Sequence, residues 1–124
     1  MRDTLNELYD ILVKSVELDE WIVHNGLETY CNGILDESKE LLDAFRNKDS
    51  ENIKEELGDI LMNTIIACIL AEKEGIGSSR DIINNAISKI KRRRPYIEEN
   101  RKVSKEESVK IWMDVKKEEK NKDI

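Results

Sequence analysis

Apolar residues recur at helical intervals in the N-terminal part of the chain. Leu5, Leu8, Leu12 and Val16 follow one another at spacings of three or four, with charged residues between them. This spacing places the apolar side chains on one face of an α-helix and the charged ones on the other. It predicts an amphipathic helix over residues 4–18.

A turn is predicted at residues 24–26, where the chain reads His-Asn-Gly. Gly26 tolerates the positive φ that turns often require. A second helix is then expected over residues 27–46, with an apolar stripe that includes Ile34 and Leu41.

The next connection is short and polar, because residues 47–49 read Asn-Lys-Asp. Such a brief link predicts an antiparallel helical hairpin, with Ser50 as the N-cap of a third helix over residues 51–73. From Ile60 to Leu70 this helix is apolar on nearly every side. It is therefore expected to be surrounded by protein, either as the central helix or as an oligomer contact.

A fourth helix is expected after a glycine-containing break. Gly75 and Gly77 end the third helix, and Ser78 with Asp81 resembles a capping box that opens the next one. This fourth helix should stop before Pro95, because the residue that precedes a proline avoids helical conformation.

A second capping-box pattern, Ser104 with Glu107, predicts a last helix. Its lysine-rich tail, about residues 117–124, is expected to fray. No linker rich in Pro, Gly or Ser divides the chain. The predicted fold is an all-α bundle of about four to five helices that forms one domain over residues 1–124.

Composition agrees with this fold and narrows the function. Charged residues are 39% of the chain, aromatic residues 5%, and there is one proline, which favours helices with solvated faces over short strands. The net charge of −6 argues against broad nucleic-acid binding, which requires a positive field. The most apolar stretch, residues 60–71, is too short to cross a bilayer. With no export signal and no paired cysteine pattern, the sequence predicts a soluble, cytoplasmic protein.

Four carboxylates are notable for their spacing. Glu37 and Glu40 on the second helix lie three residues apart, as do Glu56 and Asp59 on the third. In an antiparallel hairpin the two pairs can converge, and their mutual repulsion is relieved by a divalent cation. An all-oxygen site suits Mg²⁺ or Mn²⁺ rather than Zn²⁺. Acidic pairs also arise by chance on solvated faces in a chain with 27 acids, so spacing alone leaves both interpretations open.

Asn63 shares a face of the third helix with these acids. It follows Asp59 by four residues and Glu56 by seven. Its amide can hold a ligand oxygen or one of the carboxylates, and we include it among the candidate substrate-binding residues.

Five basic residues occupy six positions near the end of the fourth helix, namely Lys89, Lys91, Arg92, Arg93 and Arg94. Lys89, Arg92 and Arg93 share one face and form a donor set suited to phosphate oxygens. Two other interpretations stay open. The cations can stabilise the helix C-terminus, or they can form a nucleic-acid patch, which the acidic remainder of the chain disfavours.

Trp112 and Lys116 lie four residues apart on the last helix, so an indole and an ammonium group can meet a substrate together. A tryptophan at such a position is more often a core residue. His24, Cys31 and Cys68 show no spacing that marks a metal site or a reactive thiol, and we interpret them as structural.

Four motifs follow one another along the chain. Residues 36–41 read Asp-Glu-Ser-Lys-Glu-Leu, and residues 55–61 read Glu-Glu-Leu-Gly-Asp-Ile-Leu. Residues 89–97 read Lys-Ile-Lys-Arg-Arg-Arg-Pro-Tyr-Ile, and residues 112–116 follow the pattern Trp-x-x-x-Lys. They resemble the E-E-x-x-E, E-E-L-G-D, K-x-x-R-R-H-P-H-V and W-x-x-x-K motifs of the MazG family of all-α nucleotide pyrophosphohydrolases. Trp21 is similar to the family's upstream tryptophan segment. The resemblance covers nearly the whole chain.

The resemblance implies a set of site residues. It makes four acids both catalytic and metal-binding, with Mg²⁺ as the cofactor and Mn²⁺ as a substitute: Glu37, Glu40, Glu56 and Asp59. It places the triphosphate and the nucleotide against a second set, to which the spacing adds Asn63 and Lys116: Lys54, Glu55, Lys89, Arg92, Arg93 and Trp112. Arg94 and Tyr96 replace two histidines of the family pattern, which leaves base specificity open.

The resemblance also implies a reaction and an assembly. We expect Mg²⁺-dependent attack of water at the α-phosphorus of a nucleoside triphosphate, which releases pyrophosphate, with Glu37 and Glu40 as alternative general bases. We expect a homodimer of interlocked helices or a dimer of dimers. The alternatives are a narrower enzyme for dCTP, dUTP or phosphoribosyl-ATP, and a non-catalytic nucleotide-binding or helical interaction protein.

Overall fold

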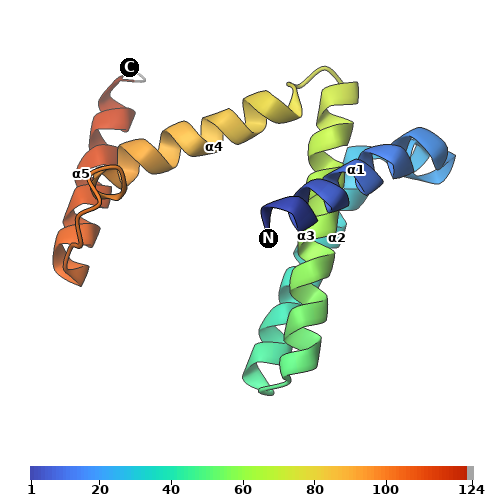
Figure 1. Cartoon of the computed structure of the whole chain (residues 1–124), viewed down its shortest axis with the longest axis horizontal. Coiled ribbons are helices and arrows are strands. Elements are labelled where there is room, and N and C mark those ends of the chain that lie inside the picture. The colour runs from blue at the N-terminus through green and yellow to red at the C-terminus, as the bar shows by residue number, and fades with distance from the viewer. Residues whose placement is uncertain (123–124) are drawn as a thin grey trace. The chain divides into compact units, whose positions relative to one another are not determined.

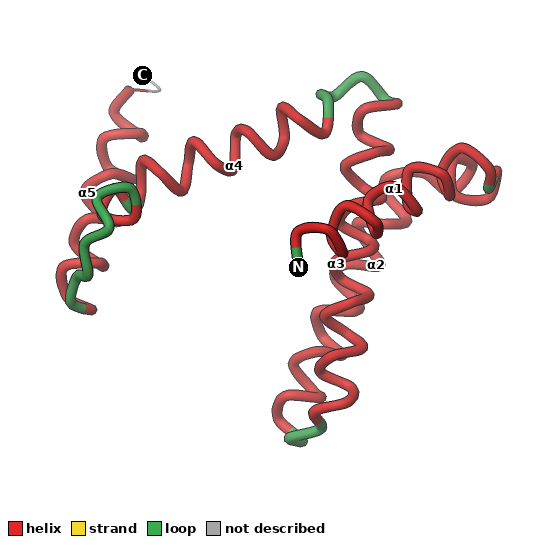
Figure 2. The backbone as a smooth tube through the Cα atoms, in the orientation of Figure 1, coloured by secondary structure: helices red, strands yellow, loops and turns green. Residues whose placement is uncertain are grey.

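The computed structural model describes residues 1–122 and is helical through most of that range (Figures 1 and 2). The elements in chain order are α1 (Arg2–Leu18), α2 (Glu20–Arg46), α3 (Ser50–Lys73), α4 (Ser79–Arg93), the 3₁₀ turn η1 (Pro95–Ile97) and α5 (Lys105–Lys122). No strand occurs within residues 1–122. The predicted all-α fold class is confirmed.

The chain forms two compact units. The first comprises Met1–Ser79 and the second begins at Arg80. The single domain over residues 1–124 stays a prediction.

The core of the first unit is made by α1, α2 and α3. Its buried side chains are Leu12 and Val16 from α1, Ile22 from α2, and Ile66, Ile69 and Leu70 from α3. All the α3 members come from the second half of that helix, where the sequence is apolar on nearly every side. α2 and α3 lie side by side along the lower part of the same unit (Figure 1). The predicted central position of α3 is therefore confirmed within this unit.

The predicted turn at residues 24–26 is present as a break inside a helix. Gly26 has φ of 72° and interrupts α2, which begins at Glu20 rather than at residue 27. A non-glycine residue would be strained at this φ. The glycine therefore redirects the chain between residues 20–25 of α2 and the long segment that carries Glu37 and Glu40.

The predicted N-cap of the third helix is wrong by one residue. Ser50 is the first residue of α3, and Asp49 is the cap, with its carboxylate accepting a hydrogen bond from the Asn52 backbone N–H at 3.3 Å. The Asn52 side chain also donates to Asp49 at 2.8 Å. Aspartate caps as well as serine does, and its charge favours the positive end of the helix dipole.

In the second unit, the two helices start and stop close to their predicted positions. α4 begins directly after Ser78 and ends at Arg93, before Pro95. Ser104 accepts a hydrogen bond from the Glu107 backbone N–H at 3.1 Å, as the capping pattern predicted. α5 continues to Lys122, whereas fraying was expected from about residue 117. Residues 123–124 of that expected tail lie outside the described residues. Among those that are described, no helix is long and apolar enough to cross a membrane.

Candidate active site

The α2–α3 hairpin places its acidic pairs opposite each other. Lys48, with φ of 55°, stands at the middle of the connecting turn. Glu37 and Asp59 each lie eleven residues from Lys48, while Glu40 and Glu56 each lie eight residues from it. In two helices that run back along each other, positions equally distant from the turn face one another. The convergence expected from the sequence follows from this register.

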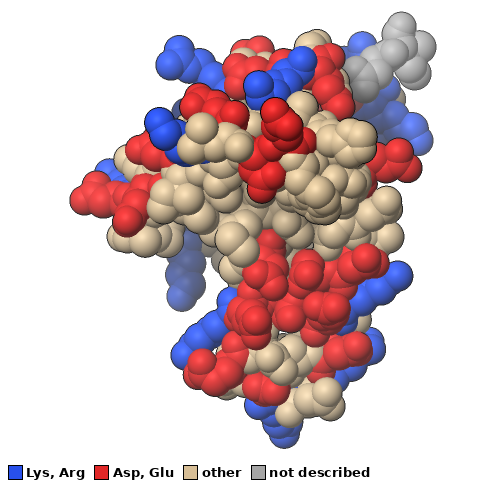
Figure 3. Space-filling model, turned by 90° about the vertical axis from the view of Figure 1, so that its right-hand side faces the viewer, with Lys and Arg blue, Asp and Glu red and all other residues tan. Residues whose placement is uncertain are grey.

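Three of the four acids place a carboxylate oxygen close to those of the other two. One carboxylate oxygen from each of Glu37, Glu56 and Asp59 lies within 4.8 Å of the others. All three side chains are half-buried, whereas Glu40 is exposed and lies outside this group. Figure 3 shows acidic side chains gathered over the lower part of the molecule, where the hairpin lies. We refer to Glu37, Glu56 and Asp59 as the carboxylate cluster.

The carboxylate cluster raises the pKa of one of its members, Glu56. The pKa of Glu56 is raised to about 8, first by a side-chain hydrogen bond with Glu37, then by burial and by the negative charge of Glu37, with smaller contributions from Glu40. Two buried oxygens, Oε2 of Glu37 and Oε2 of Glu56, have no hydrogen-bond partner among the described residues. Buried oxygens of this kind normally have a partner. These two oxygens therefore retain the capacity to accept a hydrogen bond or to ligate a cation.

These observations fit a hard divalent cation. The donors are carboxylate oxygens, the ligand class that Mg²⁺ and Mn²⁺ prefer. A cation between the three side chains would neutralise their repulsion and satisfy the two oxygens that have no partner. Below the cluster, towards the turn, a small hollow adds further polar groups, and Glu40, Asp43, Ala44, Asn47, Asp49, Asn52 and Glu56 line it.

Asn63 lies against the backbone of α2, on the face that carries the cluster. A Cβ atom built on Gly33 would lie 3.0 Å from Nδ2 of Asn63, so this approach depends on a glycine. Gly33 and Asn63 are each fifteen residues from Lys48 and so belong to the same register as the acids. Sequence reasoning identified Asn63 but missed Gly33. The available signal was a glycine four residues before Glu37, on the same helix face.

The second unit brings its arginines together around a carboxylate. Nε of Arg92 donates to Oε1 of Glu119 at 2.7 Å, and Arg93 donates to the same side chain through Nη2 at 3.0 Å and Nε at 3.3 Å. The hydrogen bonds from Arg93 and then Arg92 lower the pKa of Glu119 to about 2. Glu119 was missed in the sequence, although it follows Trp112 by seven residues and so shares its helix face.

Trp112 belongs to the same group of side chains. The guanidinium carbon of Arg93 lies 4.9 Å from the centroid of the indole ring, and that of Arg94 lies 5.2 Å from it. Both distances are within the range of cation–π attraction. Trp112 is half-buried and packs against these two arginines, while its predicted contact with a substrate stays a prediction.

A match to a known family covers most of these residues. Residues 25–98 match the MazG nucleotide pyrophosphohydrolase domain. The chain belongs to the MazG family.

Curated relatives and a solved structure agree with this assignment. The chain is 35% identical over 104 residues to "Uncharacterized protein YabN" of Bacillus subtilis, covering 83% of this chain and 21% of that one. It is 33% identical over 121 residues to the "Nucleoside triphosphate pyrophosphohydrolase/pyrophosphatase MazG" of Thermotoga maritima, covering 94% and 45%. The chain thus spans less than half the length of both relatives. The crystal structure of a mazG-related protein from Thermotoga maritima superposes with a TM-score of 0.83 at 27% identity, over 90% of this chain and 98% of that one.

Some residues that the MazG resemblance implied belong neither to the carboxylate cluster nor to the group around Arg92 and Arg93. Lys54 and Glu55 are exposed, and Lys54 pairs with Glu51 at 3.3 Å, with both side chains largely in solvent. Lys89 and Lys116 are exposed as well. Their substrate-binding roles stay predictions, as do those of the residues in both groups.

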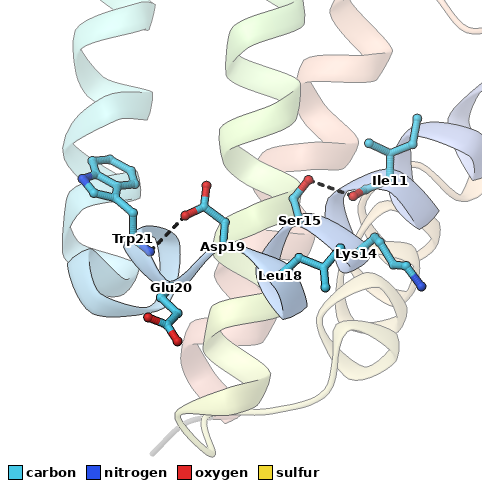
Figure 4. Close-up of a pocket in the computed structure, with 7 residues that line it drawn as sticks. All are labelled: Ile11, Lys14, Ser15, Leu18, Asp19, Glu20 and Trp21. Carbon is cyan, nitrogen blue, oxygen red and sulfur yellow. Dashed lines mark hydrogen bonds between the residues drawn. The ribbon is translucent and has the colours of Figure 1, made fainter.

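One hollow in the first unit of this MazG chain shares no lining residue with either group. It opens where α1 meets α2 and is lined by Ile11, Lys14, Ser15, Leu18, Asp19, Glu20 and Trp21 (Figure 4). The carboxylate of Asp19 accepts a hydrogen bond from the Trp21 backbone N–H at 3.0 Å and so caps α2. The indole of Trp21 and the side chain of Lys14 stand at opposite ends of the hollow (Figure 4). None of its lining residues belongs to the carboxylate cluster.

Proposed function

We propose that this chain hydrolyses nucleoside triphosphates to a nucleoside monophosphate and pyrophosphate, in a reaction that requires Mg²⁺. The observation that carries the proposal is the carboxylate cluster, three half-buried acids with two buried oxygens that lack a partner. Support also comes from two relatives of this chain, one from Thermotoga maritima and one from Escherichia coli, that are named nucleoside triphosphate pyrophosphohydrolases.

Glu37, Glu56 and Asp59 would hold the cation, with Glu40 beside them. When bound, Mg²⁺ supplies Lewis-acid polarisation of the phosphoryl oxygens and neutralises their charge. Without it, the negative cluster would repel a triphosphate, so substrate binding at this cluster depends on the cation.

Glu40 is the better candidate for the general base. It is exposed and lies outside the group of three close carboxylates, whereas Glu37 belongs to that group and would hold the cation. An oxygen of the Glu40 carboxylate would accept a proton from the attacking water as the new oxygen–phosphorus bond forms. The bond between the α-phosphorus and its bridging oxygen would break, and pyrophosphate would leave with the electron pair.

The basic residues of the second unit would bind phosphate oxygens. Arg92 and Arg93 present planar donor groups that suit oxyanions, and Lys89 precedes them on the same helix. Such donors stabilise the negative charge of a phosphate or pyrophosphate group. We propose no nucleic-acid partner, because the net charge is −6.

Pyrophosphate release from a panel of ribo- and deoxynucleoside triphosphates tests this function. We expect release with Mg²⁺, slower or equal release with Mn²⁺, and none with excess EDTA. Preference for dCTP, dUTP or phosphoribosyl-ATP would identify a narrower enzyme. Binding of nucleotides without any turnover would contradict the proposal in favour of a nucleotide-binding protein.

Two glutamine variants test the assignment of the cluster. Glu56→Gln should reduce turnover by about a hundredfold or more, since it removes a cation ligand, while far-ultraviolet circular dichroism stays unchanged. Glu72→Gln makes the same charge change at an exposed position of α3 and should keep normal turnover. Normal activity in Glu56→Gln would refute the proposed site.

A further inference from the structure

The two arginines of the second unit hold a carboxylate from their own chain. Glu119 receives three hydrogen bonds from Arg92 and Arg93, at 2.7, 3.0 and 3.3 Å. Both of its oxygens are used, so the carboxylate lies across the donors in the way that a planar oxyanion does. A phosphate group uses the same donors in the same manner.

The ion pair is open to solvent on one side. The Arg92 side chain is 49% exposed, compared with 22% for Glu119 and 17% for Arg93. A hollow adjoins the pair and is lined by Arg92, Val115, Glu118, Glu119 and Lys122. An incoming anion can therefore reach Arg92 without unfolding either helix. Glu119 itself reaches its partners through a flexible side chain, so a change of rotamer is enough to release them.

The ion pair with Glu119 reduces the ability of Arg92 and Arg93 to bind another anion. While Glu119 occupies the donors, Arg92 and Arg93 cannot offer the same hydrogen atoms to a phosphate. A site that is competent for only part of the time binds its ligand more weakly by the fraction that is competent. A partly exposed ion pair favours its closed form by a factor of a few to about ten.

We propose that Glu119 is a built-in competitor for the oxyanion site formed by Arg92 and Arg93, and that it exchanges with a phosphate or pyrophosphate group. The inference rests on the proposed function in one respect, because a triphosphate substrate supplies such groups. Glu119 then sets how strongly this site retains pyrophosphate. Its displacement of the product would favour release.

Titration calorimetry with inorganic pyrophosphate in the presence of EDTA tests this proposal. Excess EDTA removes the metal-dependent binding that the carboxylate cluster would add. The variants are Glu119→Gln, which keeps the side-chain shape but loses the charge, and Glu118→Gln, which makes the same charge change in the same hollow without touching the arginines. Arg92→Gln removes one of the donors at an exposed position.

Glu119→Gln should bind pyrophosphate about three- to tenfold more tightly than the unmodified chain. Glu118→Gln should change the affinity by less than about twofold, and Arg92→Gln should abolish the gain when combined with Glu119→Gln. Glu119→Asp, whose carboxylate is retained on a shorter stem, should show an intermediate gain. It also provides a second measurement if the glutamine variant folds poorly.

Four results would overturn the proposal. They are weaker or unchanged binding in Glu119→Gln, an equal gain in Glu118→Gln, binding that is insensitive to Arg92→Gln, and no detectable binding in any variant. Weaker binding in Glu119→Gln would mean that Glu119 holds the arginines in place for the anion. The calorimetry measures pyrophosphate binding and not turnover. The proposal for Glu119 can therefore be supported even if the chain does not hydrolyse nucleotides.

Discussion

Glu56 lies against a second glutamate of the cluster, and its raised pKa of about 8 is the consequence. Each of the two glutamates is tolerable on a helix surface alone. Together, half-buried and each with one oxygen that has no hydrogen-bond partner within residues 1–122, they favour the protonated form of Glu56. This arrangement lowers the stability of the fold at neutral pH when no cation is bound. It also favours tight binding of a cation.

Glu56→Gln should therefore act on stability and on metal binding in opposite directions. In EDTA at pH 8 the variant should melt at a higher temperature than the unmodified chain, because one of the mutually repelling charges is gone. Mg²⁺ should raise the melting temperature of the unmodified chain and leave that of Glu56→Gln nearly unchanged. Scanning calorimetry with and without Mg²⁺ measures both effects.

Glu72→Gln is the matched control, since it lies in the same helix at an exposed position outside the cluster. It should respond to Mg²⁺ as the unmodified chain does. An undiminished Mg²⁺ response in Glu56→Gln would show that Glu56 is not a ligand.

Residue identity and spacing predicted part of these contacts and missed others. Glu37, Glu56 and Asp59 could be found because i, i+3 spacing on two linked helices is visible along the chain. Glu119 could not be assigned to Arg93, 26 residues earlier, because their pairing depends on how η1 and its flanking loop return the chain. The chain places Glu119 among many other acids, and nothing local distinguishes it.

At the scale of the element, the hairpin of α2 and α3 matters more than either helix alone. Its geometry depends on a short turn, a cap at Asp49 and a close approach at Gly33. The sequence predicted the turn and both helices, because periodicity and short polar links are local signals. The cap was assigned one residue too late, since Asp49 and Ser50 are both good caps and only the backbone conformation distinguishes them.

Two glycine-to-alanine substitutions distinguish the effect of close packing on stability from the effect of helix propensity. Gly58→Ala should stabilise the chain by about 0.5–1 kcal/mol, since alanine favours helix and nothing lies within 4 Å of the new Cβ. Gly33→Ala should lose that gain, because its Cβ must displace the Asn63 amide. We expect Gly33→Ala to be less stable than Gly58→Ala by about 1 kcal/mol or more in urea unfolding. Equal stabilities would mean that Asn63 moves aside freely.

At the scale of the whole molecule, the hairpin leaves an apolar surface uncovered. A groove with an almost wholly apolar lining runs along it, formed by Ser38, Leu41, Leu42, Phe45 and Ile53. Phe45 is 68% exposed, and Leu57 and Leu61 of α3 are also exposed. Contiguous apolar surface of this kind is typical of protein interfaces. It supports the predicted homodimer or dimer of dimers, which stays a prediction.

Phe45→Lys should weaken self-association without unfolding the first unit, because the side chain is mostly in solvent there. Sedimentation velocity over a range of concentrations should show a dimer or larger assembly for the unmodified chain and a shift towards monomer for Phe45→Lys. Ile97→Lys, at a residue that is 57% exposed in the second unit, should leave assembly unchanged. A chain that is monomeric throughout, or equal assembly in both variants, would contradict this prediction.

The mirror register of the hairpin about Lys48 also restricts how its length can change during evolution. A single inserted residue between the turn and one acidic pair would rotate that pair by about 100° around its helix and away from its partners. Insertions of about seven residues, two helical turns, in both helices would restore the facing positions. The separation of sixteen residues between Glu40 and Glu56 can therefore change in steps of about fourteen but not one residue at a time. Relatives that retain this site should differ freely in the residues between the two pairs and very little in their number.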